Sequence, residues 1–170
     1  IRFHNRISKR KERNMKKRIK VLIIITLVCS TAWLLSFSFE SQAAASVEIE
    51  RIIDGDTFIA KIDGITETVR LIGIDAPELG DCFSSQATRI LRQQLFNHTI
   101  WIAEGDEPRD PYGRLLAYVF QDDGTFVNLE MVKAGAATAE RVSPNVEYAN
   151  LIGTAHDEAY IAQRGGWKTC

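Results

Sequence analysis

The chain has 170 residues, a length typical of one folded domain rather than several, and a formal net charge of only −1. That small value hides two unlike parts: residues 1–45 contain ten Lys or Arg and two Asp or Glu, whereas residues 46–170 contain eleven and twenty, a net charge of −9. No internal repeat or low-complexity tract is present, which excludes a repeat architecture.

Residues 1–45 have the pattern of a targeting segment and are set apart from the fold. A basic stretch, Met15–Lys20, precedes an uncharged apolar run of nineteen residues, 21–39, and small residues follow at Ser41–Ser46. This run is compatible with a cleaved signal peptide and is also long enough to span a bilayer as an uncleaved anchor. In both cases the positive flank stays inside, so the domain at 46–170 is expected to be secreted or extracytoplasmic.

Three strands are predicted at the start of that domain. Val47 and Ile49 alternate with acidic residues, and two further strand-like runs follow at Thr57–Ile62 and Thr66–Ile74. Asp63-Gly64 between those runs is a strong signal for a tight turn, so the two runs are predicted to form a hairpin.

A helix, two strands and two helices are predicted next. The expected ranges are a helix at 84–97, a strand at 99–104, a polar loop at 105–114, a strand at 115–120, a helix within 126–137 and a last helix within 143–167, closed by Gly165-Gly166. Ser84 or Ser85 is the expected N-cap of the first helix, and Gly135 the expected C-cap of the second. Five short strands with a helix after the third fit a five-stranded Greek-key barrel of the oligonucleotide-binding type, an α+β fold that is mainly β.

Two stretches place carboxylates at the ends of predicted strands. In Asp54–Thr57, the Asp-Gly pair alone indicates only a turn, which Asp56 would cap. Beside Gly73–Glu78 it gains importance, because two neighbouring strand ends would then present Asp56 and Asp75. Two close carboxylates repel each other, and one becomes protonated unless a cation lies between them. Oxygen ligands with a turn carbonyl suit Ca²⁺ better than a transition metal, so a calcium site is predicted.

Two arginines and one more carboxylate suit phosphate chemistry. Arg70 and Arg114 are far apart in the sequence, and the donor fork of a guanidinium matches the oxygens of a phosphate. Arg114 directly follows the turn Asp110–Gly113, and Glu78 would activate a water while the metal and the arginines neutralise charge. The alternative is that both arginines form ordinary surface salt bridges, which contribute little to stability.

Cys82 and Cys170 are the two cysteines of the domain expected to be exported. An even number of cysteines in such a domain suggests a disulfide, which would tie the loop after Glu78 to the end of the chain. The alternative is two free thiols.

Three motifs, taken together, identify a resemblance. IDGDTF, VRLIGIDAPE and DPYGRLLAYVF followed by VNLEMVKAGAA resemble the staphylococcal nuclease-like (thermonuclease) family over about residues 47–168. The resemblance implies an oligonucleotide-binding barrel with three helices and Ca²⁺-dependent hydrolysis of DNA and RNA. By motif position it implies calcium ligands at Asp56, Asp75 and the Ala76 carbonyl, a general base at Glu78, phosphate-binding arginines at Arg70 and Arg114, and a nucleotide contact at Tyr112.

The sequence also departs from the family pattern. Pro111 stands where a substrate-binding lysine is expected, and residues 137–145 lack the tyrosines that stack on the nucleotide base. The net charge of −9 opposes a polyanionic substrate, because nucleic-acid affinity comes mainly from cations. A non-catalytic binding module of the same fold and a calcium-stabilised structural domain are the alternative hypotheses. The expected protein is a monomer that acts on DNA, RNA or both, with a membrane anchor at 21–39 if the leader is not cleaved.

Overall fold

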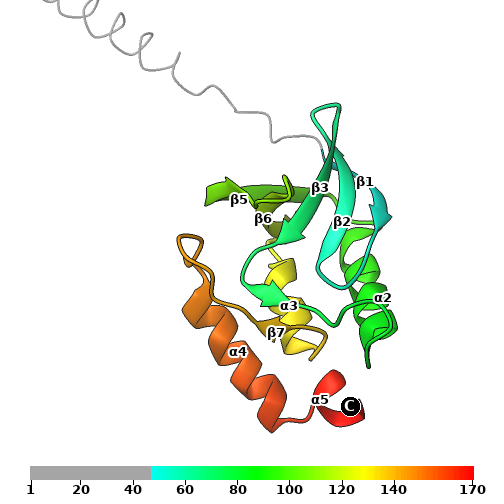
Figure 1. Cartoon of the computed structure of the whole chain (residues 1–170). Coiled ribbons are helices and arrows are strands. Elements are labelled where there is room, and N and C mark those ends of the chain that lie inside the picture. Colours follow the sequence, from blue (N-terminus) through cyan, green and yellow to red (C-terminus); the bar gives the residue numbers. More distant parts are fainter. Residues whose placement is uncertain (1–46) are drawn as a thin grey trace, which may run out of the picture. The chain divides into compact units, whose positions relative to one another are not determined.

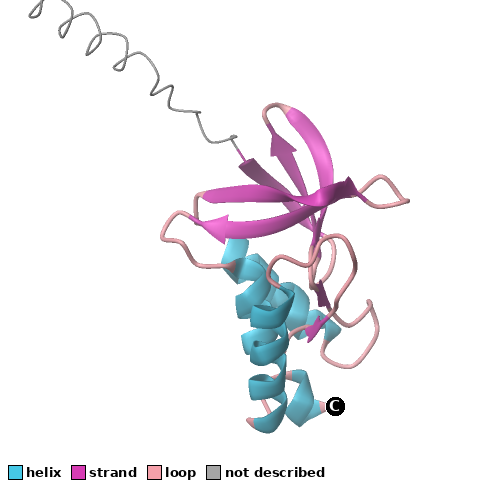
Figure 2. Cartoon of the chain, turned by 90° about the vertical axis from the view of Figure 1, so that its left-hand side faces the viewer, coloured by secondary structure: helices cyan, strands magenta, loops and turns pink. Residues whose placement is uncertain are grey.

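A computed structural model describes residues 47–170, so the predicted signal peptide or anchor in residues 1–45 lies outside the described residues. Within 47–170 the fold is α+β, with one five-stranded sheet and helices that gather on one side of it (Figures 1 and 2). None of the helices in this range has the length and hydropathy needed to cross a membrane.

The large sheet has the strand order β1-β2-β3-β6-β5. Its strands are β1 (Val47–Ile52), β2 (Thr57–Ile62), β3 (Ile65–Leu71), β6 (Leu115–Gln121) and β5 (Ile100–Arg109). All neighbours are antiparallel except β3 and β6, which run parallel with Arg70 opposite Leu116. The order ends at β1 and β5, and the described residues contain no ladder between these two strands. The strand pairing therefore shows a five-stranded sheet, and it does not by itself establish the closed barrel that was predicted.

Two strand predictions need correction. The strand expected at 66–74 ends at Leu71, because Gly73 has a left-handed φ of 82° and turns the chain. The chain then forms β4 (Ile74–Asp75), which pairs with β7 (Thr138–Ala139) in a separate two-stranded sheet. The other correction concerns the loop expected at 105–114, because β5 continues through its first half after a register shift and pairs Arg109 with Leu115.

Four helices follow or separate these strands: α2 (Ser84–Leu95), α3 (Val127–Lys133), α4 (Ala149–Ile161) and the short α5 (Gly166–Thr169). The predicted N-cap was wrong, because Phe83 takes that position with φ 70° and no side chain caps the helix. The helix predicted within 143–167 corresponds to α4, which is shorter than that range and ends at Ile161, not at the glycine pair.

The C-cap of α3 is Ala134, and Gly135, the predicted C-cap, lies one residue beyond it. The φ of 65° at Gly135 is left-handed, its N–H donates to the carbonyl of Val132, and the N–H of Ala136 donates to that of Met131. This is the bond pattern of a Schellman motif, in which glycine avoids the strain that a side chain would add. A Cβ at Gly135 would also collide with the main chain of Arg164. Glycine is therefore required here both by the left-handed φ and by the lack of space.

One amide side chain holds α3 against the sheet from inside the core. Asn128 is fully buried; its Oδ1 accepts a bond from the Val119 N–H, and its Nδ2 donates to the carbonyls of Ile72 and Ala117. A buried amide is tolerated only when its polar atoms are paired, as they are here. Asn128 thereby fixes the segment that connects β3 to β4, from which the candidate site is built.

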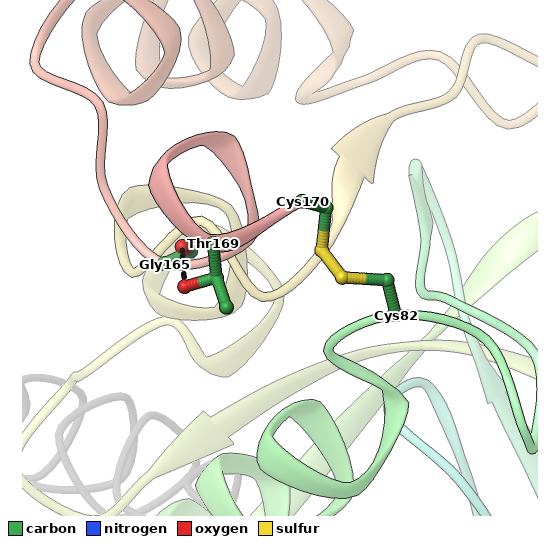
Figure 3. Close-up of a disulfide and its surroundings, with 4 residues drawn as sticks. All are labelled: Cys82, Gly165, Thr169 and Cys170. Carbon is green, nitrogen blue, oxygen red and sulfur yellow. Dashed lines mark hydrogen bonds between the residues drawn. A yellow bond between two sulfur atoms is a disulfide. The ribbon is translucent and has the colours of Figure 1, made fainter.

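The C-terminus is fastened to the rest of the domain by two contacts. Cys82 and Cys170 form a disulfide, which confirms the pairing expected from the sequence (Figure 3). In addition, the Gly166 N–H donates to the carbonyl of Gly135 at 2.9 Å, a close main-chain approach between α5 and the end of α3. The last turn of the chain therefore has a defined place beside the loop that contains Cys82.

Removing the disulfide is expected to destabilise the domain strongly. The cysteines are 88 residues apart, and loop-closure entropy for such a separation is worth at most about 4–5 kcal/mol. Thermal unfolding of the oxidised chain should show a clearly higher Tm than that of the Cys82→Ser/Cys170→Ser variant. Reductant should lower the Tm of the wild type and leave that of the variant unchanged; a wild-type Tm insensitive to reductant contradicts the prediction.

Candidate active site

The first half of the site is centred on the guanidinium of Arg70, at the end of β3. Its Nη1 lies 3.0 Å from Oδ2 of Asp56, and its Nη2 lies 3.1 Å from Oδ1 of Asp75. Nη1 also donates to the carbonyls of Leu71 and Ile74 at 3.1 and 2.8 Å. Both carboxylates that were predicted to lie close together contact the same guanidinium, so the cation they share in this structure is that of Arg70.

Asp56 is the buried member of this cluster, with only 5% of its surface exposed. Its Oδ2 accepts the Ala76 N–H at 2.6 Å, and its Oδ1 accepts the Thr57 hydroxyl at 2.9 Å. Burial raises the pKa of Asp56 from 3.8 to about 6, although Arg70 and the Ala76 N–H act in the opposite direction. Burial therefore outweighs both partners, and Asp56 holds its proton more tightly than an exposed aspartate does.

Asp54, which was predicted only to be part of a turn, shapes the main chain around Asp56. Oδ1 of Asp54 accepts the N–H groups of both Asp56 and Thr57. This local side-chain bond folds the link between β1 and β2 back on itself. It directs Asp56 inward, where the N–H of Leu71 donates to its carbonyl.

The second half of the site is the turn before β6. Asp110 accepts the N–H groups of Tyr112 and Arg114 with Oδ1, and the Nε of Arg114 with Oδ2 at 2.6 Å. Burial disfavours its charge, but the hydrogen bonds from Arg114 hold the pKa of Asp110 below its usual value. Because Arg114 uses Nε for this bond, its two terminal nitrogens stay available, and its side chain is 34% exposed. Tyr112 is largely exposed and stacks against this guanidinium.

The sheet brings these two halves to adjacent strands. Arg70 is the penultimate residue of β3, and Arg114 immediately precedes β6, the parallel neighbour of β3. Sequence reasoning could not place them next to each other, because the pairing joins segments that are more than forty residues apart. The alternative of two unrelated surface salt bridges does not describe Arg70, whose side chain is only 12% exposed.

Glu78 lies in the exposed loop after β4, three residues beyond Asp75. No ion pair within residues 47–170 involves it. It lines a pocket of about 610 Å³ together with Asp75 and Ala76. Glu78 is thus a carboxylate without a counter-ion that opens toward a cavity beside the Arg70 cluster.

Two residues at the site were missed by sequence reasoning. Glu140, directly after β7, has its Oε2 3.6 Å from Nη2 of Arg70, and Asp110 holds Arg114. The β4–β7 pairing brings Glu140 to the site, and no local pattern indicates that contact. Asp110 could have been found, since Asp-Pro-Tyr-Gly is a turn whose first side chain commonly binds the following main chain.

The oxygen atoms of Asp56 and Asp75 fit part of a site for a divalent cation. In residues 47–170 no three His, Cys, Asp or Glu side chains are grouped to hold a metal by themselves. The two carboxylates nevertheless converge on one positive charge, the guanidinium of Arg70. Ca²⁺ completes its shell with main-chain carbonyls and water, so a site with two carboxylates and the carbonyl of Ala76 has the right chemistry.

The sequence of this domain is similar to known proteins over most of its length. The family described as Staphylococcal nuclease homologue matches residues 68–169, a range that includes Arg70, Asp75, Glu78 and Arg114. The chain is 38% identical over 126 residues to a thermonuclease of Staphylococcus intermedius and 31% identical over 126 residues to one of Staphylococcus hyicus; each alignment covers 71% of this chain and 74% of the relative. An uncharacterized endonuclease of Escherichia coli O157:H7 is 31% identical over 119 residues, 70% of this chain and 74% of the relative.

Asp56 is expected to make the metal-free fold less stable as pH rises. Its folded-state pKa of about 6 lies above the ordinary 3.8, so the folded chain holds the proton more tightly. The free energy of unfolding should then fall between about pH 4 and pH 6 and level off above, a loss on the order of 3 kcal/mol. Urea unfolding from about pH 3 to pH 8 measures it, with Asp56→Asn as the control that cannot titrate. The same pH dependence in both proteins would show that another group is responsible.

Proposed function

Because the chain belongs to the staphylococcal nuclease family, we propose that it is an exported, Ca²⁺-dependent nuclease that hydrolyses phosphodiester bonds of DNA, RNA or both. The observation that supports this most directly is the placing of Arg70 at the end of β3 and of Arg114 directly before its parallel neighbour β6, with the Arg70 partner Asp75 lining the same pocket as Glu78. Export is supported by the basic and apolar pattern of residues 1–45.

Calcium would be held by Asp56, Asp75 and the carbonyl of Ala76. When bound, Ca²⁺ supplies positive charge that neutralises phosphodiester oxygens during hydrolysis. The chain contributes the carboxylates in a rigid setting, since Asp56 is fixed by Thr57 and by the Ala76 N–H. Asp75 is more exposed, with 58% of its side chain open, so it can exchange partners without disturbing the core.

Glu78 would act as the general base. It accepts a proton from the water that attacks phosphorus; the bond from phosphorus to the leaving sugar oxygen breaks, and that oxygen is protonated from solvent. Because no ion pair occupies Glu78 within the described domain, its carboxylate is free to accept that proton.

The two arginines would not contribute in the same way. Arg114 is held through Nε and keeps its terminal N–H groups for the phosphate oxygens, which gain negative charge in the transition state. Arg70 is bound to three carboxylates and two carbonyls, so it first organises the site and reaches a phosphate only as Asp75 or Glu140 gives way. Substitution of Arg70 should therefore lower the free energy of unfolding as well as the activity.

A non-catalytic binding module of the same family is the second candidate function. The acidic surface favours it, because eleven Lys or Arg stand against twenty Asp or Glu in residues 46–170. The positive charge of the site is local, and the nuclease hypothesis requires only that Arg114 and a bound cation outweigh the acidic surroundings over a few nucleotides.

Two substitutions separate these functions. Glu78→Gln keeps the shape but removes the proton acceptor and should lower kcat by roughly 10²–10⁴-fold. Arg114→Ala should lower mainly kcat, by roughly 10²–10³-fold, since its charge is needed most in the transition state. The measurement is cleavage of denatured DNA and of RNA with millimolar Ca²⁺. Arg89→Ala is the matched control, because Arg89 is an exposed arginine of α2, a helix from which no residue lines the pocket, and its substitution should leave kcat unchanged.

The nuclease proposal fails if pure wild-type chain cleaves neither substrate above the Glu78→Gln background. Circular dichroism and Tm must be compared for all variants, so that loss of folding is not taken for loss of catalysis.

Calcium binding is tested separately, without turnover. Titration calorimetry should detect Ca²⁺ binding to the wild type, and saturating Ca²⁺ should raise its Tm by mass action. Asp75→Asn should weaken both effects strongly, whereas Asp122→Asn should change neither, because Asp122 is an exposed carboxylate after the end of β6 and β3 pairs only with the start of that strand. Equal Ca²⁺ affinity in wild type and Asp75→Asn rejects the assigned ligands.

A further inference from the structure

The two terminal nitrogens of Arg70 have different kinds of partners. Nη1 contacts groups of the interior, namely the buried carboxylate of Asp56 and two main-chain carbonyls. Nη2 contacts the carboxylates of Asp75 and Glu140, whose side chains are 58% and 47% exposed. An anion that arrives from solvent therefore reaches Arg70 at Nη2, where these two carboxylates already lie.

Glu140 is the more weakly attached of the two partners of Nη2. This nitrogen donates a hydrogen bond to Oδ1 of Asp75 at 3.1 Å. Oε2 of Glu140 lies 3.6 Å from the same nitrogen, which is beyond hydrogen-bond distance, so Glu140 acts on Arg70 through its charge alone. The side chain of Glu140 can therefore turn into solvent without breaking a hydrogen bond to Arg70.

The main chain fixes the point from which this side chain extends. Glu140 directly follows β7, which lies beside β4 as its antiparallel partner (Figure 1). The N–H of Glu140 donates to the carbonyl of Gly73 at 2.9 Å. The preceding N–H, that of Ala139, donates to Nδ1 of His156 on α4 at 3.0 Å. The backbone on both sides of the peptide group is thus bound, and the carboxylate of Glu140 stays close to Arg70.

The charges around Arg70 are unbalanced. One guanidinium contacts the three carboxylates of Asp56, Asp75 and Glu140, so the cluster has a net charge of −2 when all three are ionised. A Ca²⁺ ion held by Asp56 and Asp75 would bring this net charge to zero. Glu140 is then the group that cancels a surplus positive charge, and its presence weakens the attraction of the cluster for any phosphate.

We propose that Glu140 is a specificity-determining residue, which competes with phosphate for Nη2 of Arg70 and favours the diesters inside a nucleic-acid chain over phosphates at its ends. The inference rests on the proposed nuclease function and narrows its substrate. Repulsion between Glu140 and a phosphate grows with the charge of that phosphate. A terminal phosphate carries close to two negative charges above its second pKa of about 6, whereas an internal diester carries only one. Glu140 therefore disfavours the terminal phosphate more strongly.

Binding of two small phosphates tests this competition without turnover. Phenyl phosphate is a dianion at pH 8, its methyl ester is a monoanion, and both have the same ring. Titration calorimetry on the full chain, with Ca²⁺ present, compares wild type with Glu140→Gln, which is similar in shape but uncharged. The variant should bind the dianion roughly five- to twentyfold more tightly than wild type does, and the monoanion only roughly two- to fivefold more tightly. Glu140→Asp keeps the charge and should remain closer to wild type for both probes.

Glu48→Gln is the matched control, because it removes the same charge from an exposed glutamate at another place. Glu48 lies opposite Lys61 near the end of β2, whereas Arg70 lies opposite Thr57 at its start. This variant should bind both probes as wild type does, so a gain in Glu140→Gln cannot be assigned to net charge alone. Thermal unfolding of both variants checks that each is folded.

Cleavage of denatured DNA adds a second measurement. In an active enzyme, Glu140→Gln should raise kcat/KM mainly by lowering KM, because the substitution strengthens binding of the phosphate already in the ground state. A merely structural role of Glu140 would instead lower Tm and kcat together.

The outcomes for Glu140 and for the nuclease are distinguishable. The inference is overturned if Glu140→Gln binds the dianion no more tightly than Glu48→Gln does, or if the two probes gain equally. Active nuclease with either of those results leaves the proposed function standing and removes only the role of Glu140. Phosphate binding that depends on Glu140 in a chain without cleavage activity supports that role and moves the function to a binding module.

Discussion

The site depends on one buried ion pair, between Arg70 at the end of β3 and Asp56 before β2. Asp56 is almost completely removed from water, and a buried carboxylate without a partner would cost several kcal/mol. Arg70 supplies that partner and at the same time binds two main-chain carbonyls of the segment that leads into β4. The same guanidinium thus fixes the position of Asp75 and sets where the loop with Glu78 begins. Its removal would leave Asp56 unpaired and the β3–β4 link without its anchor.

Because of this arrangement, the two arginines have different roles at the site. Arg70 has most of its donors committed to the protein, whereas Arg114 gives one donor to Asp110 and presents the rest outward. A domain with a net charge of −9 can therefore still offer concentrated positive charge at one point. Charge screening over about 8–10 Å at physiological salt makes such local charge more important than the net value. The acidic residues at the site also have a function of their own, since each arginine is oriented by a carboxylate.

Stability and site geometry share the same C-terminal contacts. The disulfide from Cys82 to Cys170 and the close approach of Gly135 to Gly166 hold α5 against the loop that follows Glu78. The pocket wall with Trp167 exists because these contacts bring the last residues of the chain beside residues near position 80. Loss of either contact would loosen the wall of the pocket. It would affect the core less, because Asn128 holds α3 to the sheet independently of the C-terminus.

The sequence by itself determined the elements whose signals are local. The hairpin at Asp63-Gly64, the strand Thr57–Ile62 and the glycine after α3 follow from alternation and from φ requirements, which neighbouring residues set. It also indicated the residues of the site, because carboxylates and arginines at the ends of apolar strands are costly unless their charges are compensated. Only the tertiary structure decided that Arg70 lies between Asp56 and Asp75, that Glu140 joins them, and that α5 forms a pocket wall. Those contacts join segments far apart in the chain, and their geometry follows from strand pairing and packing, which no local pattern encodes.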